Sequence, residues 1–529
     1  MSFYEEIFDL IKSKKIQSKE NLHSFKLKLC RKYGLGHVPS DTDILSHLPS
    51  DLPDNDRKMF YSILRRKPMR TISGVAIVAV MTSPEKCPHG ACIPCPGGVE
   101  HHTPQSYTGF EPAAMRAIRN DFDPYLQTRN RLEQLKAIGH PVDKIDMILM
   151  GGTFTSRHPV YQEWFTKRCF DGLNGEKASS LDYAKQLNER AHSRCIGLTV
   201  ETRPDWCRLQ HVDQILQFGA TRVELGVQSI YDTVLYAMRR GHTVADSVYA
   251  TRILKDAGLK VCYHMMPGLP ESTQEMDIDS FQTIFNDQQF KPDMIKIYPT
   301  LVVGKTRLHE LWKNGKYEPL SEMKAIYIIR EIKEFIPEWV RIQRIQRDVP
   351  AQYIDAGVKK SNLRQLVKEE MKKHNKSCRC IRCREIGHKT LKNGIKPTEE
   401  NVKLFRRNYM ASDGCEIFLS YEDTEYDAII GYLRLREVVS PHRRELLKEP
   451  CMIIRELKVL GNELPVGEKP LREWQHRGYG KKLIMEAERI CSEEFEGKKL
   501  FVLSGVGVKE YYRKLGFTDN GVYLSKTVA

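Results

Sequence analysis

The chain has 529 residues, 41% of them hydrophobic, which is enough for two or three folded domains and excludes a disordered protein. Its net charge of +15 favours a polyanionic partner such as nucleic acid. No apolar signal segment opens the chain, and apolar runs such as 74–81 are too short to span a bilayer. We therefore expect a cytoplasmic protein with no membrane partner. The 14 cysteines form two tight clusters plus scattered singles, which indicates metal sites rather than a disulfide framework.

Residues 1–70 are predicted to form a short helical region rich in basic residues. Ile7, Leu10 and Ile11 fall on one face of a helix. The basic residues of this region include Lys12, Lys14, Lys15, Lys19, Lys26, Lys28, Arg31 and Lys32. Any one of them is most simply a solvated surface residue, but together they predict a nucleic-acid-binding arm.

Residues 71–345 change to short β-rich runs separated by amphipathic stretches. The expected strands are 72–81, 145–150, 195–202, 222–228, 261–266 and 294–298, and the expected helices include 115–137 and 245–257. Six strands that alternate with helices predict a parallel sheet in a partial (β/α)6 barrel. In such barrels the chemistry takes place at the C-terminal ends of the strands.

The first predicted strand leads directly into a cluster of three cysteines: Cys87, Cys92 and Cys95. Three thiolates can hold a [4Fe–4S] cluster by three of its irons, which leaves the fourth iron open for S-adenosylmethionine. A zinc site completed by His89, His101 or His102 is the alternative. Structural zinc sites are usually closed by four protein ligands, so a set of three favours a reactive cluster.

Polar and glycine residues follow four successive predicted strands. Gly151 and Gly152 come after the second strand, where glycine lets the backbone approach a ligand closely. Glu201 ends the third strand, Gln228 the fourth, and His264 lies at the end of the fifth. The ends of parallel strands meet at one rim of a barrel, so these positions predict a ligand site.

A predicted basic linker, residues 346–398, carries the second cysteine cluster: Cys378, Cys380 and Cys383. The spacing suits a structural zinc knuckle with His374 or His388 as a candidate fourth ligand, and a second iron–sulfur cluster is the alternative. Lysines and arginines surround the cluster, which predicts contact with a phosphate backbone. A soluble connecting segment is the simpler interpretation of the same charges.

Residues 399–529 are predicted to form a separate α/β domain. The expected strands are 416–419, 428–435, 453–460 and 500–504, with a helix over 482–491. The run Gln475-His-Arg-Gly-Tyr-Gly-Lys481 precedes this helix, and a helix N-terminus can hold a pyrophosphate. In this context the run matches the Gln/Arg-x-x-Gly-x-Gly acyl-CoA signature of the GNAT acetyltransferase fold; a turn without a ligand is the alternative.

A radical S-adenosylmethionine barrel joined to a GNAT domain resembles the family of Elongator catalytic subunits (elongator protein 3), in its archaeal form, over nearly the whole chain. The motifs that carry the resemblance are Cys87–Gly98, Gln105–Gly109, Met150–Phe154, Leu198–Pro204 and Gly505–Gly516. The spacing of the first three cysteines, four residues and then two, is similar to that of prokaryotic members.

The resemblance implies modification of the wobble uridine in the anticodon stem-loop of tRNA. Cys87, Cys92 and Cys95 would bind the [4Fe–4S] cluster. Residues at the strand ends would line the S-adenosylmethionine site: Gly151, Gly152, Glu201 and Gln228. A deoxyadenosyl radical would remove hydrogen from the methyl group of acetyl-CoA, the resulting carbon would add to C5 of uracil, and thioester hydrolysis would leave 5-carboxymethyluridine.

The resemblance also implies an acetyl-CoA site in the GNAT domain. A strand edge and a pyrophosphate loop would hold the ligand: Glu456, Leu457, Lys458, Val459, Tyr479, Gly480 and Lys481. Tyr512 would lie near the thioester as a hydrogen-bond donor or acid, although simple packing is an alternative role. Lys144, projecting from the barrel, would reach the same ligand.

Two other functions remain open from the sequence. A GNAT lysine acetyltransferase with a structural iron–sulfur cluster would use a carboxylate base, for which Glu456 is a candidate. A tRNA-binding scaffold that senses acetyl-CoA would make no product. The sequence does not decide between a homo-oligomer and a chain that needs accessory subunits.

Overall fold

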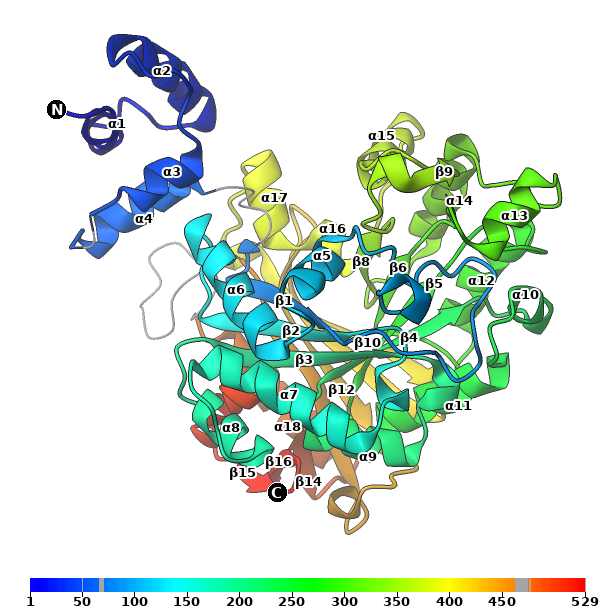
Figure 1. The fold of residues 1–529 in the computed structure, drawn as a ribbon. Coiled ribbons are helices and arrows are strands. Elements are labelled where there is room, and N and C mark those ends of the chain that lie inside the picture. The colour runs from blue at the N-terminus through cyan, green and yellow to red at the C-terminus, as the bar shows by residue number, and fades with distance from the viewer. Residues whose placement is uncertain (50, 66–70, 462–473, 475–476, 529) are drawn as a thin grey trace.

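The computed structural model describes residues 1–49, 51–65, 71–461, 474 and 477–528 (Figure 1). The chain opens with four helices: α1 (Phe3–Lys12), α2 (Lys19–Lys32), α3 (Asp41–Ser46) and α4 (Asp54–Leu64). Their apolar faces form a core of their own around Ile7, Ile11 and Phe60, and Figure 1 shows the group at one side of the molecule, where Leu45 and Tyr61 meet the chain at Gly139. Lys26 is buried and pairs with Asp41 at 3.0 Å, so it is not part of the exposed basic surface.

The second unit is a seven-stranded parallel sheet in the order β1-β2-β3-β4-β5-β6-β8. Its strands are β1 (Val75–Met81), β2 (Lys144–Met150), β3 (Arg194–Thr202), β4 (Arg222–Gln228), β5 (Lys260–Met265), β6 (Met294–Ile297) and β8 (Arg341–Ile345). The partial barrel is confirmed, and β8 is a seventh strand that was not identified from the sequence. A short pair, β7 (Val302–Val303) and β9 (Ile354–Ala356), lies outside the sheet.

Helices cover the outer face of this sheet (Figure 1). They are α6 (Pro124–Ala137), α7 (Pro159–Asn174), α8 (Leu181–Asn188), α9 (Leu209–Gln217), α11 (Val244–Asp256), α12 (Gln274–Asn286) and α14 (Glu322–Phe335). Three other helices pack at the edges: α5 (Pro112–Arg119) against Met81 of β1, α10 (Asp232–Ala237) beside Cys92, and α13 (Arg307–Lys313) beside β7. The single helix expected over 115–137 is wrong. Asp121 and Phe122 adopt left-handed φ angles of 48° and 57°, and Asp123 starts α6 by accepting a hydrogen bond from Leu126 N at 2.8 Å.

Side chains of β2 alternate between the two faces of the barrel sheet. In β2, Ile145, Met147 and Leu149 are buried beneath the helices, whereas Asp146 and Ile148 point into the barrel. The barrel interior therefore receives polar and charged residues from several strands, unlike the apolar fill of an ordinary barrel core.

The C-terminal domain is a seven-stranded sheet in the order β10-β11-β12-β13-β14-β16-β15. Its strands are β10 (Val402–Ala411), β11 (Gly414–Asp423), β12 (Ala428–Glu437), β13 (Cys451–Val459), β14 (Lys499–Val502), β15 (Thr518–Asn520) and β16 (Tyr523–Thr527), and its helices are α18 (Tyr479–Arg489) and α19 (Lys509–Arg513). β13 and β14 are the parallel pair, and they are paired only over residues 451–454 of β13. Beyond that point the two strands separate. Helices α15 (Leu363–Lys373), α16 (Ile381–Arg384) and α17 (Ile386–Asn393) connect the two domains.

The C-terminal domain packs against the N-terminal ends of the barrel strands. Gly505 abuts β3 so closely that a Cβ there would overlap the backbone carbonyl of Ile196. A buried network of charges joins the two domains: Lys255, Asp256, Asp293, Glu416, Arg434, Arg436 and Arg455. In the described part of the chain, no helix is both long enough and apolar enough to cross a membrane.

Candidate active site

The loop that follows β1 holds the first three cysteines in a defined conformation. The backbone N–H of Cys87 donates to Gln105 Oε1 at 2.7 Å, and the N–H of Ser106 donates to Cys95 Sγ at 3.2 Å. All three cysteines line one cavity. Burial and the neighbouring Cys92 raise the pKa of Cys95 to about 11, so this thiol would ionise at neutral pH only against bound metal.

Two basic side chains reach the sulfur of Cys92, which otherwise packs against apolar residues. His89 Nε2 lies 3.2 Å from its sulfur and Arg240 Nη1 lies 3.6 Å from it. The second guanidinium nitrogen of Arg240 donates to the carbonyl of Gly226 at 2.8 Å. Such donors suit sulfurs that carry the negative charge of an iron–sulfur cluster.

The strand ends above the cysteines contain hydrogen-bonding groups that no side chain satisfies. Gln228 has a left-handed φ of 72°, and its Oε1 is buried without a partner in the part of the chain that the structure describes. Arg240 Nε and Arg203 Nη1 are also buried without a hydrogen-bond partner among the described residues. Gly151 must be glycine, because a Cβ there would overlap the Thr82 hydroxyl. Unpaired donors and acceptors beside the cysteines fit a zwitterionic ligand such as S-adenosylmethionine.

One cavity of about 390 Å³ connects the cysteines with the C-terminal domain. It passes through the barrel interior and ends at Glu456 and Lys458 of β13, beside Arg341, Glu385 and His388. The cluster loop and the proposed acetyl-CoA strand therefore open into the same space, from opposite ends of the barrel. This continuity is the central feature of the site.

A band of charges crosses the barrel between the two ends. Glu224 is fully buried and contacts Lys296, His264 Nε2 at 2.8 Å and Arg222 Nε at 3.6 Å. Lys296 also lies 3.6 Å from Glu201, which accepts a 2.8 Å hydrogen bond from Tyr107. Burial opposes the ionisation of Glu224, but Lys296 and His264 hold its pKa well below the usual range.

The other predicted site residues are distributed over two regions. Gly152, Glu201, Gln228, Glu456 and Lys458 line the cavity together with the three cysteines. The remaining predicted residues are not among its described lining residues: Lys144, Gly151, Leu457, Val459, Tyr479, Gly480, Lys481 and Tyr512. The strand alternation explains part of this division, because Leu457 packs in the core of the C-terminal domain while its two neighbours face the barrel.

The predicted pyrophosphate loop lies at the start of α18. Gly480 is buried, and a Cβ there would come within 2.7 Å of Tyr511 Oη, so Tyr511 rather than Tyr512 faces this glycine. Tyr512 is buried in the domain core, where its ring contacts those of Tyr511 and Phe517. Gln475 and His476 of the signature lie outside the described residues. Lys144 is the first residue of β2, two positions before the cavity-lining Asp146.

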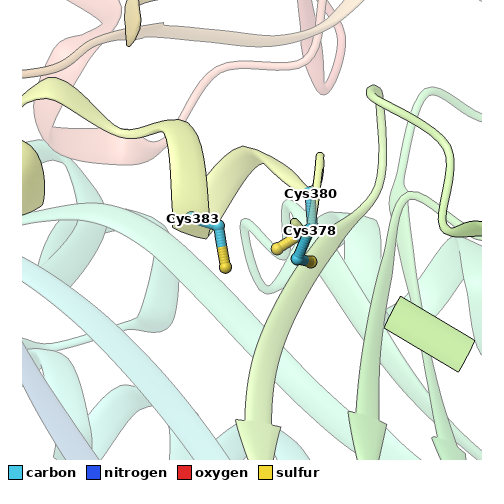
Figure 2. A group of neighbouring side chains, drawn as sticks. All are labelled: Cys378, Cys380 and Cys383. Carbon is cyan, nitrogen blue, oxygen red and sulfur yellow. The ribbon is translucent and has the colours of Figure 1, made fainter. Parts of the chain in front are cut away.

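The second cysteine cluster is compact. Figure 2 shows Cys378, Cys380 and Cys383 together, and their three sulfurs lie within 4.8 Å of one another. Within the described residues no histidine or carboxylate joins this group. His374 pairs with Glu370 at 3.2 Å, and His388 lies 3.6 Å from Glu385.

A cation lies beside this second cluster. Lys333 Nζ donates to Cys383 Sγ at 3.6 Å, and hydrogen bonds from the other two thiols lower the pKa of Cys383. Three converging sulfurs of which one ionises readily suit a thiophilic metal ion with a fourth ligand from outside the set.

Sequence reasoning did not assign roles to several residues of the cavity: Tyr107, Glu224, Arg240, His264 and Lys296. Glu224 and His264 stood in the strand-end segments that were predicted to form a ligand site, but neither was given a role of its own. The signal was present in β4, where charged residues at positions 222 and 224 alternate with apolar ones, a pattern that a strand facing an apolar barrel core would not show.

Comparison with known proteins agrees with this architecture. Residues 1–72 match the ELP3 N-terminal domain, 81–283 the Radical SAM superfamily, 292–373 the Radical_SAM C-terminal domain and 388–517 the Acetyltransferase (GNAT) family. The protein is thus an enzyme that joins a radical S-adenosylmethionine barrel to a GNAT domain.

Full-length relatives then give the family. The chain is 53% identical to "tRNA uridine(34) acetyltransferase" of Methanocaldococcus jannaschii, over 99% of this chain and 96% of that protein. It is 42% identical to Drosophila melanogaster "Elongator complex protein 3", over 99% and 95%. The structure of Methanocaldococcus infernus Elp3 lacking residues 1–46 superposes with a TM-score of 0.77 at 49% identity, covering 86% of this chain and all of that one. The chain belongs to the Elongator complex protein 3 (Elp3) family, as the motifs predicted.

Proposed function

We propose that this enzyme converts the wobble uridine of tRNA to 5-carboxymethyluridine, with acetyl-CoA as the source of the added carbons. The observation that carries the proposal is the cavity shared by the cluster cysteines and β13. The names of the archaeal relatives, which specify uridine 34 of tRNA, support the substrate. The net charge of +15 supports a polyanionic substrate such as tRNA.

The cluster and S-adenosylmethionine, held by Cys87, Cys92 and Cys95 and by the strand-end groups, would supply the one-electron chemistry that removes hydrogen from the acetyl methyl group. The protein's own contribution is to bring that methyl group to the cluster end of the cavity and to exclude water from it. The barrel strands of six or seven residues that line the cavity span roughly 20 Å at about 3.3 Å per residue. The extended arm of acetyl-CoA suits such a passage.

The mouth of the cavity at the cluster end carries two arginines and one acid, Asp348, which pairs with Arg344 at 2.7 Å. Arg344 and Arg347 line it, and Arg347 donates to the carbonyl of Ser106 in the loop next to Cys95. Guanidinium groups recognise phosphate and stack on bases, so this mouth suits an anticodon loop whose target base is turned inward.

The geometry argues against a lysine acetyltransferase that uses Glu456 as its base. Arg434 Nε donates to Glu456 at 2.9 Å. Burial works against ionisation, but Arg434, Lys260 and Lys458 together lower the pKa of Glu456. A carboxylate held by an arginine is a weak base, and this one faces the barrel interior rather than a peptide.

An anaerobic reconstitution tests the proposal. The chain, with its iron–sulfur cluster rebuilt, is mixed with S-adenosylmethionine, dithionite, acetyl-CoA and a tRNA with uridine at the wobble position, and digested nucleosides are analysed by mass spectrometry. We expect 5-carboxymethyluridine that requires both small molecules and disappears in Cys95→Ser. Lysine acetylation of added protein that survives Cys95→Ser would instead support the acetyltransferase, and tRNA binding without any product would support a scaffold.

A further inference from the structure

A histidine–carboxylate pair lies in the wall of the cavity, between its two ends. His264 Nε2 is 2.8 Å from Glu224 Oε2, and both side chains line the cavity. Lys296 contacts the same carboxylate from β6, the strand on the far side of β5. The carboxylate of Glu224 is an acceptor, so an Nε2–H of His264 would donate to it, and in that tautomer the other ring nitrogen, Nδ1, is the acceptor.

A metal ion is a poorer explanation of this group. The Cys262 sulfur also lies within 4.8 Å of the Glu224 and His264 donor atoms. However, the ammonium of Lys296 already neutralises Glu224, so a cation would have to displace it. Burial and the charge of Glu224 raise the pKa of Cys262 far above its usual value, which disfavours the thiolate that a metal needs. The arrangement suits proton transfer instead.

The proposed reaction contains one step that needs a base in this cavity. The carbon that joins uracil is bonded directly to the thioester carbonyl, about 1.5 Å away. The carbonyl that must be hydrolysed therefore lies beside the modified base. Tyr512, buried in the core of the C-terminal domain, is not among the described lining residues.

Three histidines line the cavity in the described part of the chain: His89, His264 and His388. His89 is engaged with the Cys92 sulfur at 3.2 Å. His388 lies at the opposite end, beside Glu385 and the C-terminal domain. Only His264 combines a place in the barrel interior with a carboxylate that orients its ring.

We propose that His264 is the general base that hydrolyses the thioester of CoA-linked uridine, and that Glu224 is its positioning residue; this rests on the proposed function. A water oxygen bonds to the thioester carbonyl carbon while one of its protons passes to His264 Nδ1. The carbon–sulfur bond then breaks, and CoA leaves as a thiol with that proton. The second proton is released as the carboxylic acid ionises, so the step consumes no oxidant or reductant.

The test compares the wild type with His264→Gln, Glu224→Gln and a control, His442→Gln. His442 pairs with Asp213 at 3.0 Å and is not among the described residues that line the cavity. Reconstituted proteins receive S-adenosylmethionine, dithionite, acetyl-CoA and tRNA. Deoxyadenosine, free CoA thiol and digested nucleosides are then measured over time. Cluster absorbance and circular dichroism report whether each variant is folded and loaded.

We expect His264→Gln to form deoxyadenosine at the wild-type rate but to release 5-carboxymethyluridine about a hundredfold more slowly, with CoA-linked uridine accumulating. Glu224→Gln should show the same accumulation, because its amide no longer enforces the tautomer, and His442→Gln should match the wild type.

Wild-type release of 5-carboxymethyluridine by His264→Gln would overturn the assignment. Loss of deoxyadenosine in His264→Gln, with hydrolysis intact in Glu224→Gln, would also overturn it by placing His264 in the S-adenosylmethionine site. A wild-type enzyme that makes no modified uridine would refute the proposed function itself, whatever the variants do.

Discussion

Removal of one charge from the interface between the barrel and the GNAT domain should destabilise both. Asp293 is fully buried and accepts hydrogen bonds from Arg455 at 3.0 and 2.5 Å and from Val261 N at 2.8 Å. Lys255 lies 3.8 Å away. Asp293→Asn keeps the shape of the side chain but removes its charge. Arg455 and Lys255 are then left with Glu416 as their remaining carboxylate partner. Loss of one partner of a buried ion pair costs about 3–5 kcal/mol.

Urea unfolding of the full chain, followed by tryptophan fluorescence, measures this cost. Asp182→Asn is the matched control, because Asp182 is an exposed residue paired with Lys185 and its loss should change stability by less than about 1 kcal/mol. The Asp293 pKa is lowered in the folded state, so its contribution is present above the unfolded value of about 3.9 and is lost as the pH falls. The wild type and Asp293→Asn should converge in acid. Equal midpoints for the two Asn variants at pH 7 would refute the reasoning.

Three further results are expected. Metal analysis of Cys380→Ser should show loss of zinc with iron retained, and unchanged zinc would contradict a metal site at the second cluster. Gly480→Ala should weaken CoA binding about tenfold in calorimetry, because the added Cβ meets Tyr511 Oη, and unaltered affinity would place the pyrophosphate elsewhere. Burial raises the pKa of Asp277 to about 6, so the folded state retains a proton that the unfolded chain has lost. The free energy of unfolding of the wild type should therefore fall by up to about 3 kcal/mol as the pH rises from about 4 to 6. An equal fall in Asp277→Asn over the same pH range would contradict this.

The sequence was sufficient for the features that depend on local pattern. β4 begins and ends at the predicted residues, 222 and 228, because apolar Val223, Leu225 and Val227 recur at every second position, the period of a strand. The helix expected over 115–137 is in fact two helices. The break was missed because the apolar period of the sequence continues across it. Only Asp123-Pro124, a cap followed by a first-turn proline, marks the start of the second helix.

The shared cavity could not be predicted, because it depends on how two domains meet. Nothing local relates Cys87 to Lys458, which are brought to one space by the packing of Gly505 against β3 and by the buried charges around Asp293. The partnership of Glu224 with Lys296 likewise depends on the order of strands β4, β5 and β6 in the sheet. Tertiary packing, not propensity, decides such contacts.

The central claim is that the acetyl methyl group reaches the cluster end of the cavity and reacts there. Acetyl-CoA with a fully deuterated methyl group, supplied in the anaerobic reaction with tRNA, tests it directly. The account predicts deoxyadenosine heavier by one deuterium and 5-carboxymethyluridine that retains two. Unlabelled deoxyadenosine, formed alongside the modified nucleoside, would contradict it by showing that the hydrogen comes from elsewhere.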